Sequence, residues 1–216
     1  MPRLLDGKKA EKMKYEILKN ERLSNVKKKY NFILASNSPR RKELLAGLDI
    51  PFEVKVLDGV DESFPHNLEA EKVSEYISVE KAAAYRDRIG DDDLLITADT
   101  VVILDGEIMG KPRDEHDAKQ MLSRLSGHTH LVTTGVCLTT THRQHHFSVS
   151  TKVTFKQLSE SEINYYVEHY KPMDKAGAYG IQEWIGYIGV TGIEGSYFNV
   201  MGLPVQRIYQ ELSENF

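Results

Sequence analysis

A turn rich in hydroxyl and guanidinium groups follows the first apolar run of the chain. The run FILA leads into the turn Ser-Asn-Ser, which begins at Ser36, and then into Pro39 and the adjacent Arg40 and Arg41. Proline is favoured at the first position of a helix, so a strand, a tight turn and a helix start are predicted. Free backbone N–H groups would then meet hydroxyls and fixed charges, a combination suited to a phosphate. A capped helix with solvated arginines is the alternative for this stretch taken alone.

An aspartate interrupts an otherwise apolar strand pattern. In LLITADTVVIL, Asp99 lies between two apolar runs, and we expect the strand to pause at Ala98-Asp99-Thr100. Desolvating a carboxylate costs free energy, and carboxylates with shifted pKa values gather at active sites, so we favour a functional Asp99 over a cap or turn residue. Asp61 and Glu62 follow the second predicted strand and offer oxygen donors suited to Mg²⁺, unless both are simply solvated.

Two lysines and a glutamine complete the candidate groups. Lys111 lies between a glycine and a proline, in a rigid loop that could aim its ammonium at the same cleft. Lys81 lies on an alanine-rich helix that another element can approach closely. Gln182 closes the stretch DKAGAYGIQ, where glycines and aromatics suit a flat ligand and an amide can read the edge of a base. Exposed lysines and a glycine-rich β meander are the alternatives.

The remaining reactive side chains form weaker patterns. Cys137 lies in the apolar run TTGVCLTT and is predicted to be a core residue. His142, His145 and His146 crowd a predicted hairpin tip, and with no acidic or cysteine partner nearby a zinc site is not expected. The sequence has neither a Walker loop nor a Gly-x-Ser-x-Gly elbow.

The elements that must position these groups are predicted from periodicity and caps. Strands are expected in FILA, PFEVKVLD and the run from Asp93, which should turn back at Asp105-Gly106. THLVTTGVCLTT and HFSVSTKVTFKQL should pair as a hairpin. Helices are expected over 11–29, 39–48, 68–89 with an apolar stripe of Val73, Ile77 and Ala84, 114–126, from a capping box of Ser159 and Glu162, and from about 203. This order predicts an α/β fold with a mixed, bent sheet and flanking helices, in two lobes around a cleft.

Composition and charge narrow the class of protein. The chain has 216 residues, 40% hydrophobic and 28% charged, and no apolar run approaches the ~20 residues of a membrane span. The N-terminus lacks the apolar core of a secretory signal and there is a single cysteine, so a cytoplasmic protein without membrane attachment is expected. Residues 1–30 carry ten basic and four acidic side chains and are predicted to be a solvated, helical N-terminal extension. Residues 31–216 form the predicted domain, with 18 basic and 28 acidic side chains, a poor general binder of nucleic acid.

Five motifs in one order give the chain a family resemblance. LASNSPRRKELL, EKAAA, TADTVV, GKPRD and DKAGAYGIQ with GSYFNVMGLP resemble the Maf family of nucleoside triphosphate pyrophosphatases, from about residue 31 to 213. The resemblance implies a mixed α/β fold with two lobes and a deep cleft, hydrolysis of the α–β phosphoanhydride to monophosphate and pyrophosphate, Mg²⁺ or Mn²⁺ as cofactor, and a homodimer. The alternative is a non-catalytic protein that senses nucleotides or inhibits septum formation through binding.

The resemblance also assigns roles to residues. Asp99, Glu62 and Lys111 would be catalytic, with Glu62 and Asp99 holding the metal. The substrate would be bound by Ser36, Arg40, Arg41, Lys81 and Gln182. The ADT and KAGAYGIQ motifs are similar to those of enzymes acting on dTTP and UTP, whereas the SDQ and CAGS motifs of the 7-methyl-GTP branch are absent. Glu183-Trp184 departs from the small residues expected after the glutamine.

Overall fold

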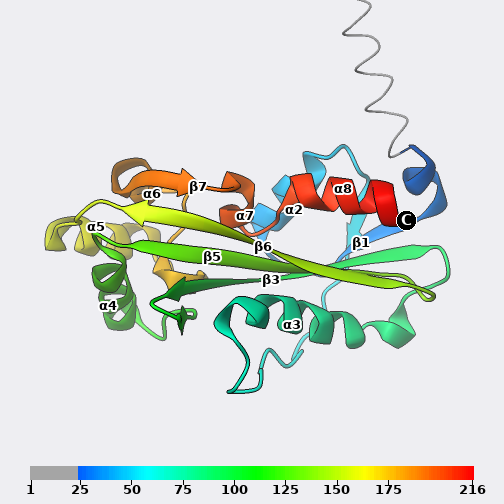
Figure 1. The fold of residues 1–216 in the computed structure, drawn as a ribbon, viewed down its shortest axis with the longest axis horizontal. Coiled ribbons are helices and arrows are strands. Elements are labelled where there is room, and N and C mark those ends of the chain that lie inside the picture. The colour runs from blue at the N-terminus through cyan, green and yellow to red at the C-terminus, as the bar shows by residue number, and fades with distance from the viewer. Residues whose placement is uncertain (1–23) are drawn as a thin grey trace, which may run out of the picture.

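A seven-stranded mixed β-sheet organises residues 24–216, the part of the chain that the computed structural model describes (Figure 1). The strands follow the order β2-β1-β3-β5-β6-β7, and β4 pairs with β3 off this path. β1 is parallel to β2 and β3, and the other pairs are antiparallel. Their bounds are β1 Asn31–Leu34, β2 Phe52–Val54, β3 Asp93–Leu104, β4 Glu107–Met109, β5 Thr129–Thr139, β6 Gln144–Phe155 and β7 Val190–Glu194. The predicted mixed α/β class is confirmed.

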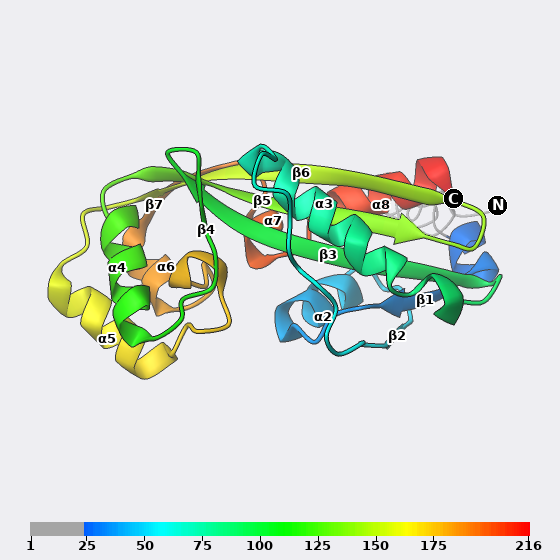
Figure 2. The same ribbon diagram turned by 90° about the horizontal axis from the view of Figure 1, so that it is seen from below.

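Helices cover both faces of the sheet and form two lobes. Figure 1 shows α3 on one face and α2, α7 and α8 on the other, and Figure 2 shows α4, α5 and α6 grouped at the opposite end of β3 from β1, β2 and α2. The helices are α2 Pro39–Ala46, α3 Ala70–Ala83, α4 Glu115–Leu125, α5 Glu160–Tyr170, α6 Trp184–Gly189, α7 Tyr197–Met201 and α8 Val205–Asn215, with 3₁₀ turns η1 Arg86–Arg88 and η2 Ala176–Ala178.

Each lobe has its own apolar cluster. In the first lobe (β1, β2, α2 and α8), Leu45 and Ile208 pack with Leu34. In the second lobe (β4, α4, α5, η2 and α6), Leu122 and Tyr166 pack together with residues of β5 and β6. The long strands contribute to both clusters and thereby fix the lobes relative to one another.

Strand β3 does not pause where the sequence suggested. It continues from Asp93 to Leu104, and Asp99 pairs with Gly135 of β5 in unbroken register. The predicted pause is wrong because the pairing with β5 continues through Asp99 while its side chain leaves the sheet. The predicted turn at Asp105-Gly106 is confirmed, with φ of 51° and 82° as a type I′ hairpin requires.

The predicted helix caps are confirmed, whereas one helix end is not. Ser38 caps α2, Asp114 caps α4, and Ser159 and Glu162 form the capping box of α5. The helix predicted for 68–89 ends earlier, since α3 stops at Ala83 and a 3₁₀ turn follows. The predicted apolar stripe is confirmed at Val73 and Ile77 and is wrong at Ala84, which is exposed; Ala82 and Tyr85 are the buried residues there.

The N-terminal extension is described only from residue 24. Residues 24–29 are helical, and the predictions for 1–23 lie outside the described residues. Val26 was expected on a solvated helix, but it is 5% exposed and packs in the first-lobe cluster. Tyr30 packs edge-on against Phe216, so the C-terminal end of the chain supplies part of this contact. Across residues 24–216, none of the helices has the length and apolar character needed to cross a membrane.

Candidate active site

A cleft of about 720 Å³ lies between the two lobes and gathers the predicted site residues. Its walls come from the β1–α2 turn, the segment before α3, α3 itself, β3, the loop after β4, and the stretch from α5 to α7. All eight candidates line it: Ser36, Arg40, Arg41, Glu62, Lys81, Asp99, Lys111 and Gln182. Residues separated by up to 146 positions in the sequence are thus brought to one cavity.

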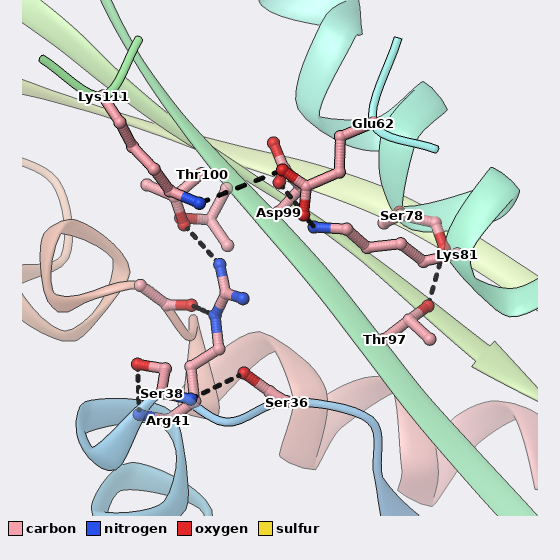
Figure 3. A network of polar contacts seen from close by, with 12 residues as sticks. Ser36, Ser38, Arg41, Glu62, Ser78, Lys81, Thr97, Asp99, Thr100 and Lys111 are labelled. Atoms are coloured by element: carbon pink, nitrogen blue, oxygen red, sulfur yellow. Dashed lines mark hydrogen bonds and ion pairs between the residues drawn. The ribbon is translucent and has the colours of Figure 1, made fainter. Parts of the chain in front are cut away.

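A lysine bridges two carboxylates on one wall of the cleft (Figure 3). Lys81 Nζ lies 2.8 Å from Asp99 Oδ1 and 2.9 Å from Glu62 Oε1, and the Lys81 and Asp99 side chains are each 14% exposed. Lys111 Nζ lies 3.9 Å from Glu62 Oε2 and is 61% exposed. Partial burial acts to raise the pKa of Glu62, but the hydrogen bond and charge of Lys81, with Lys111 and Arg41, outweigh it and lower this pKa. The cluster therefore keeps Glu62 ionised at neutral pH.

Helix α3 reaches this cluster because it packs directly on β5. A Cβ atom on Gly135, which pairs with Asp99, would lie 2.2 Å from the Glu75 backbone nitrogen. The hydroxyl of Thr97 also donates to the Ser78 carbonyl oxygen at 2.7 Å. These contacts, within the two turns of α3 that precede Lys81, set the distance of the helix from the sheet. They thereby set the Lys81–Asp99 distance.

The β1–α2 turn holds one arginine in a bracing position. Arg41 Nε donates to the Gly202 carbonyl at 2.8 Å, and its Nη2 donates to Thr100 Oγ1 at 3.1 Å. Burial lowers the pKa of this guanidinium, opposed by the nearby Asp99 charge. In the turn itself, Ser36 Oγ accepts the N–H of Ser38 at 3.2 Å and is buried with its residue. Arg41 thus ties α2 to β3 and to the end of α7.

Arg40 instead reaches across the cleft. Its Nη1 lies 3.3 Å from Asp174 Oδ2, between the first and second lobes. Partial burial acts to raise the pKa of Asp174, but Lys175 and Arg40 outweigh it and lower this pKa. Lys175 is itself buried, with its Nζ 2.8 Å from Asp174 Oδ1. The two adjacent arginines therefore have different surroundings. Arg41 is held by Gly202 and Thr100, whereas Arg40 pairs with Asp174 across the cavity.

The glycine-rich stretch after α5 forms the far wall. It folds into η2, α6, β7 and α7 rather than a β meander. Gln182 lines the cleft, and its Oε1 is buried without a hydrogen-bond partner among the described residues. Sequence reasoning missed Asp174 and Lys175 as cleft residues and used Thr100, in the ADT motif, only as a marker of the substrate class. All three lie inside motifs that carry the resemblance, so position within a motif was the available signal.

The carboxylates suit a metal ion that arrives with a phosphate ligand. Glu62 and Asp99 both contact Lys81 Nζ, so their oxygens converge on one region of the cleft. Within residues 24–216 there is no group of three or more histidine, cysteine, aspartate or glutamate side chains that could hold a metal alone. Mg²⁺ in proteins is commonly held by one or two carboxylates together with substrate phosphates and waters. The donor set therefore fits a substrate-linked Mg²⁺ and not a closed protein cage.

The other candidate groups lie away from the cleft walls. Cys137 is buried, as predicted, and burial raises the pKa of its thiol to about 11. The prediction that the hairpin histidines lack acidic partners is wrong: His145 Nε2 lies 2.7 Å from Glu211 Oε2, and His146 Nδ1 lies 2.7 Å from Glu75 Oε1. Folding brings these acids from α8 and α3, each to a different histidine.

Comparison with known proteins places the chain among its relatives. The family model described as Maf-like protein matches residues 31–215. A dTTP/UTP pyrophosphatase of Phocaeicola vulgatus is 65% identical over 89% of this chain and 99% of its own length. Proteins of the same name from Bacteroides thetaiotaomicron (58% identical, 86% of this chain, 96% of theirs) and Porphyromonas gingivalis (56%, 89% and 97%) also match.

A solved nucleoside-triphosphatase / dITP/XTP pyrophosphatase from Mycobacterium abscessus aligns over 59% of this chain and 75% of its own, with 15% identity and a TM-score of 0.37, a likeness too distant to carry weight. The family model, by contrast, spans the sheet, both lobes and every residue of the cleft. Together with relatives that are more than half identical over most of their length, it shows that this chain belongs to the Maf family.

Proposed function

We propose that this chain hydrolyses dTTP and UTP between the α- and β-phosphates, releasing the monophosphate and pyrophosphate and so clearing these or modified pyrimidine nucleotides from the pool. The observation that carries the proposal is the cleft in which the Glu62–Lys81–Asp99 cluster and Arg40 share one cavity. Relatives at 56–65% identity bear the name dTTP/UTP pyrophosphatase, which supports the substrate class.

The basic groups of the cleft would bind the phosphates. Arg40 lies at the N-terminal turn of α2, where free backbone N–H groups and the helix dipole favour an anion. A triphosphate would compete with Asp174 for this guanidinium, and the half-exposed pair is weak enough to exchange. Lys111 is exposed on its loop and can follow the charge that develops on the departing pyrophosphate. Ser36 would add a hydroxyl donor.

The carboxylates would activate water. We assign the proton acceptor to Asp99, since its carboxylate is less exposed than that of Glu62. Glu62 and Asp99 would hold Mg²⁺ or Mn²⁺, which when bound supplies charge neutralisation at the phosphates. At the other end of the substrate, Gln182 Oε1, which has no hydrogen-bond partner among residues 24–216, would accept a hydrogen bond from the pyrimidine base.

The test measures pyrophosphate from dTTP, UTP and the other common triphosphates, with Mg²⁺ and with a chelator. We expect release from the two pyrimidine nucleotides and its loss with chelator. Asp99→Asn should cost about 2–4 kcal/mol of transition-state stabilisation, roughly 30- to 1,000-fold in rate, by analogy with loss of one transition-state contact. Asp87→Asn, at an exposed site outside the cleft, is the matched control.

Other outcomes would redirect the proposal. Orthophosphate without pyrophosphate would indicate a phosphatase. Nucleotide binding without any product would favour the sensing or septum-inhibiting alternative. An Asp99→Asn protein with full, metal-responsive activity would overturn the role of Asp99.

Assembly and location belong to the same proposal. The family resemblance supports a cytoplasmic homodimer, in which each chain carries its own cleft. Light scattering of the purified protein and fractionation of cells that express it test these two statements. A monomer at micromolar concentration would contradict the first.

A further inference from the structure

A buried polar chain holds the loop between α5 and α6. Glu183 is its centre: one carboxylate oxygen accepts from the Tyr166 hydroxyl and the other lies 3.2 Å from Lys175 Nζ. Tyr166 is fully buried, and the Lys175 side chain is 8% exposed. Burial and the neighbouring carboxylate raise the pKa of Tyr166, so the hydroxyl remains a donor. Tyr166, Lys175 and Glu183 are thereby fixed to one another.

The same chain sets the backbone turn that carries Gln182. The N–H of Gly180 donates to the Tyr166 hydroxyl oxygen at 3.0 Å, and the N–H of Glu183 donates to the Gly180 carbonyl at 3.0 Å. A Cβ atom on Gly180 would lie 2.9 Å from Glu183 Cδ and 3.2 Å from Gln182 Nε2. Both side chains therefore fold tightly over this glycine, and the position of Glu183 limits where the Gln182 amide can lie.

The charges in this chain lead toward the phosphate end of the cleft. Lys175 contacts Asp174 as well as Glu183, and Asp174 pairs with Arg40 of the first lobe. A buried ion pair adds little to stability compared with apolar packing, whereas it can favour a single arrangement. An unbroken row of contacts thus runs from Arg40 to the loop of Gln182.

We propose that Glu183 is a positioning residue that fixes the Gln182 amide toward the nucleobase, through its contacts with Tyr166 and Lys175. The inference rests on the proposed function. Glu183 directly follows Gln182 and stands where the family resemblance leads us to expect a small residue. Glu183 itself is not one of the residues that line the cleft, whereas Gln182 is, so Glu183 acts on base selection rather than on bond cleavage.

The experiment compares Glu183→Ala, Glu183→Gln and Tyr166→Phe, each checked for folding by circular dichroism. KM and kcat are measured for dTTP and for dATP. For Glu183→Ala we expect KM for dTTP to rise about tenfold, kcat to stay within about twofold, and the dTTP/dATP ratio of kcat/KM to fall about tenfold, as for the loss of one aligned hydrogen bond. Glu183→Gln keeps a side-chain acceptor and should retain most of the wild-type dTTP/dATP ratio of kcat/KM. Glu168→Ala removes a surface glutamate that pairs with Lys119 and is the control.

The outcomes separate this inference from the function on which it rests. If the wild-type protein releases no pyrophosphate from any triphosphate, the proposed function fails; calorimetry with α,β-imido-dTTP and α,β-imido-dATP then measures the same ratio as binding. If the wild-type protein is active and Glu183→Ala lowers kcat/KM equally for all triphosphates, or leaves every kcat/KM unchanged, the positioning role is overturned. If Glu183→Ala does not fold, Tyr166→Phe decides, because it removes the hydroxyl that donates to Glu183: the dTTP/dATP ratio of kcat/KM should fall, and an unchanged ratio overturns the proposal.

Discussion

Replacing Lys81 with methionine would remove the cation that joins the two cleft carboxylates. Lys81 contacts Asp99 at 2.8 Å and Glu62 at 2.9 Å. Methionine keeps an unbranched side chain of similar length and a similar helix propensity, so α3 should form as before. The substitution therefore tests charge and hydrogen bonding with little change in packing.

The expected cost follows from burial. A hydrogen bond to a charged group contributes about 1.5–3 kcal/mol, and the contact with Asp99, at 14% exposure on both sides, belongs in the upper half of this range. The contact with Glu62, which is half exposed, contributes up to about 1 kcal/mol after solvent screening. Lys81→Met should then destabilise the protein by about 3 kcal/mol at pH 7.5, and lower Tm by about 9 °C for a chain of this size.

The pH dependence has a definite sign. The folded-state pKa of Glu62 lies below its ordinary value, so the stability it contributes is present above the unfolded-state pKa and is lost as pH falls through the folded-state value. Lys81 lowers the pKa of Glu62, so its removal also removes this pH-dependent contribution to the free energy of unfolding. The difference between wild type and Lys81→Met should therefore narrow, by up to about 1 kcal/mol, as pH falls below 4.5, the ordinary pKa of Glu62.

Urea unfolding followed by circular dichroism at pH 7.5, 5, 4 and 3 provides the measurement. Lys119→Met, which removes the lysine of a more exposed pair with Glu168, is the matched control and should cost less than about 1 kcal/mol. A Lys81→Met protein within about 0.5 kcal/mol of wild type at pH 7.5 would refute the estimate. A difference that widens between pH 5 and pH 3 would refute the sign.

Three further predictions concern the scaffold. Gly135→Ala should destabilise the protein by about 3 kcal/mol in urea unfolding, because its Cβ would collide with the backbone of α3 at Glu75; a loss below about 1 kcal/mol would show that the helix shifts freely. Ser159→Ala should cost about 1 kcal/mol in the same assay through loss of the capping box with Glu162, and an unchanged midpoint would contradict it. Cys137 should not react with a thiol reagent at pH 8 until urea unfolds the protein, since burial raises its pKa to about 11, whereas rapid labelling of the folded chain would contradict its burial.

Short-range features of this protein were readable in the sequence. The hairpin turn at Asp105-Gly106 and the caps at Ser38, Asp114 and Ser159 each depend on residues within four positions of one another. Such signals are local, because a positive φ or a free N–H group is satisfied by its own neighbours. The candidate residues of the cleft likewise lie in short motifs, each of which can be recognised separately.

Contacts between segments that are distant in the sequence are seen only in the tertiary structure. The continuous course of β3 through Asp99 depends on β5, and the acids beside His145 and His146 come from other helices. Adjacent arginines in the sequence have separate surroundings, since Arg41 is bound by Gly202 and Arg40 by Asp174.

The residue types that suit phosphate and base were therefore determined by the sequence alone, and the distances and partners that tune them were decided by the fold. The sequence does not indicate which groups pair with Asp99 on β3, with Lys81 on α3 or with Glu183. The packing of α3 on Gly135 and the closure of the second lobe around Tyr166 bring these groups together. Charge and hydrogen-bond energies depend on separations of a few ångströms, which only the packed tertiary structure determines.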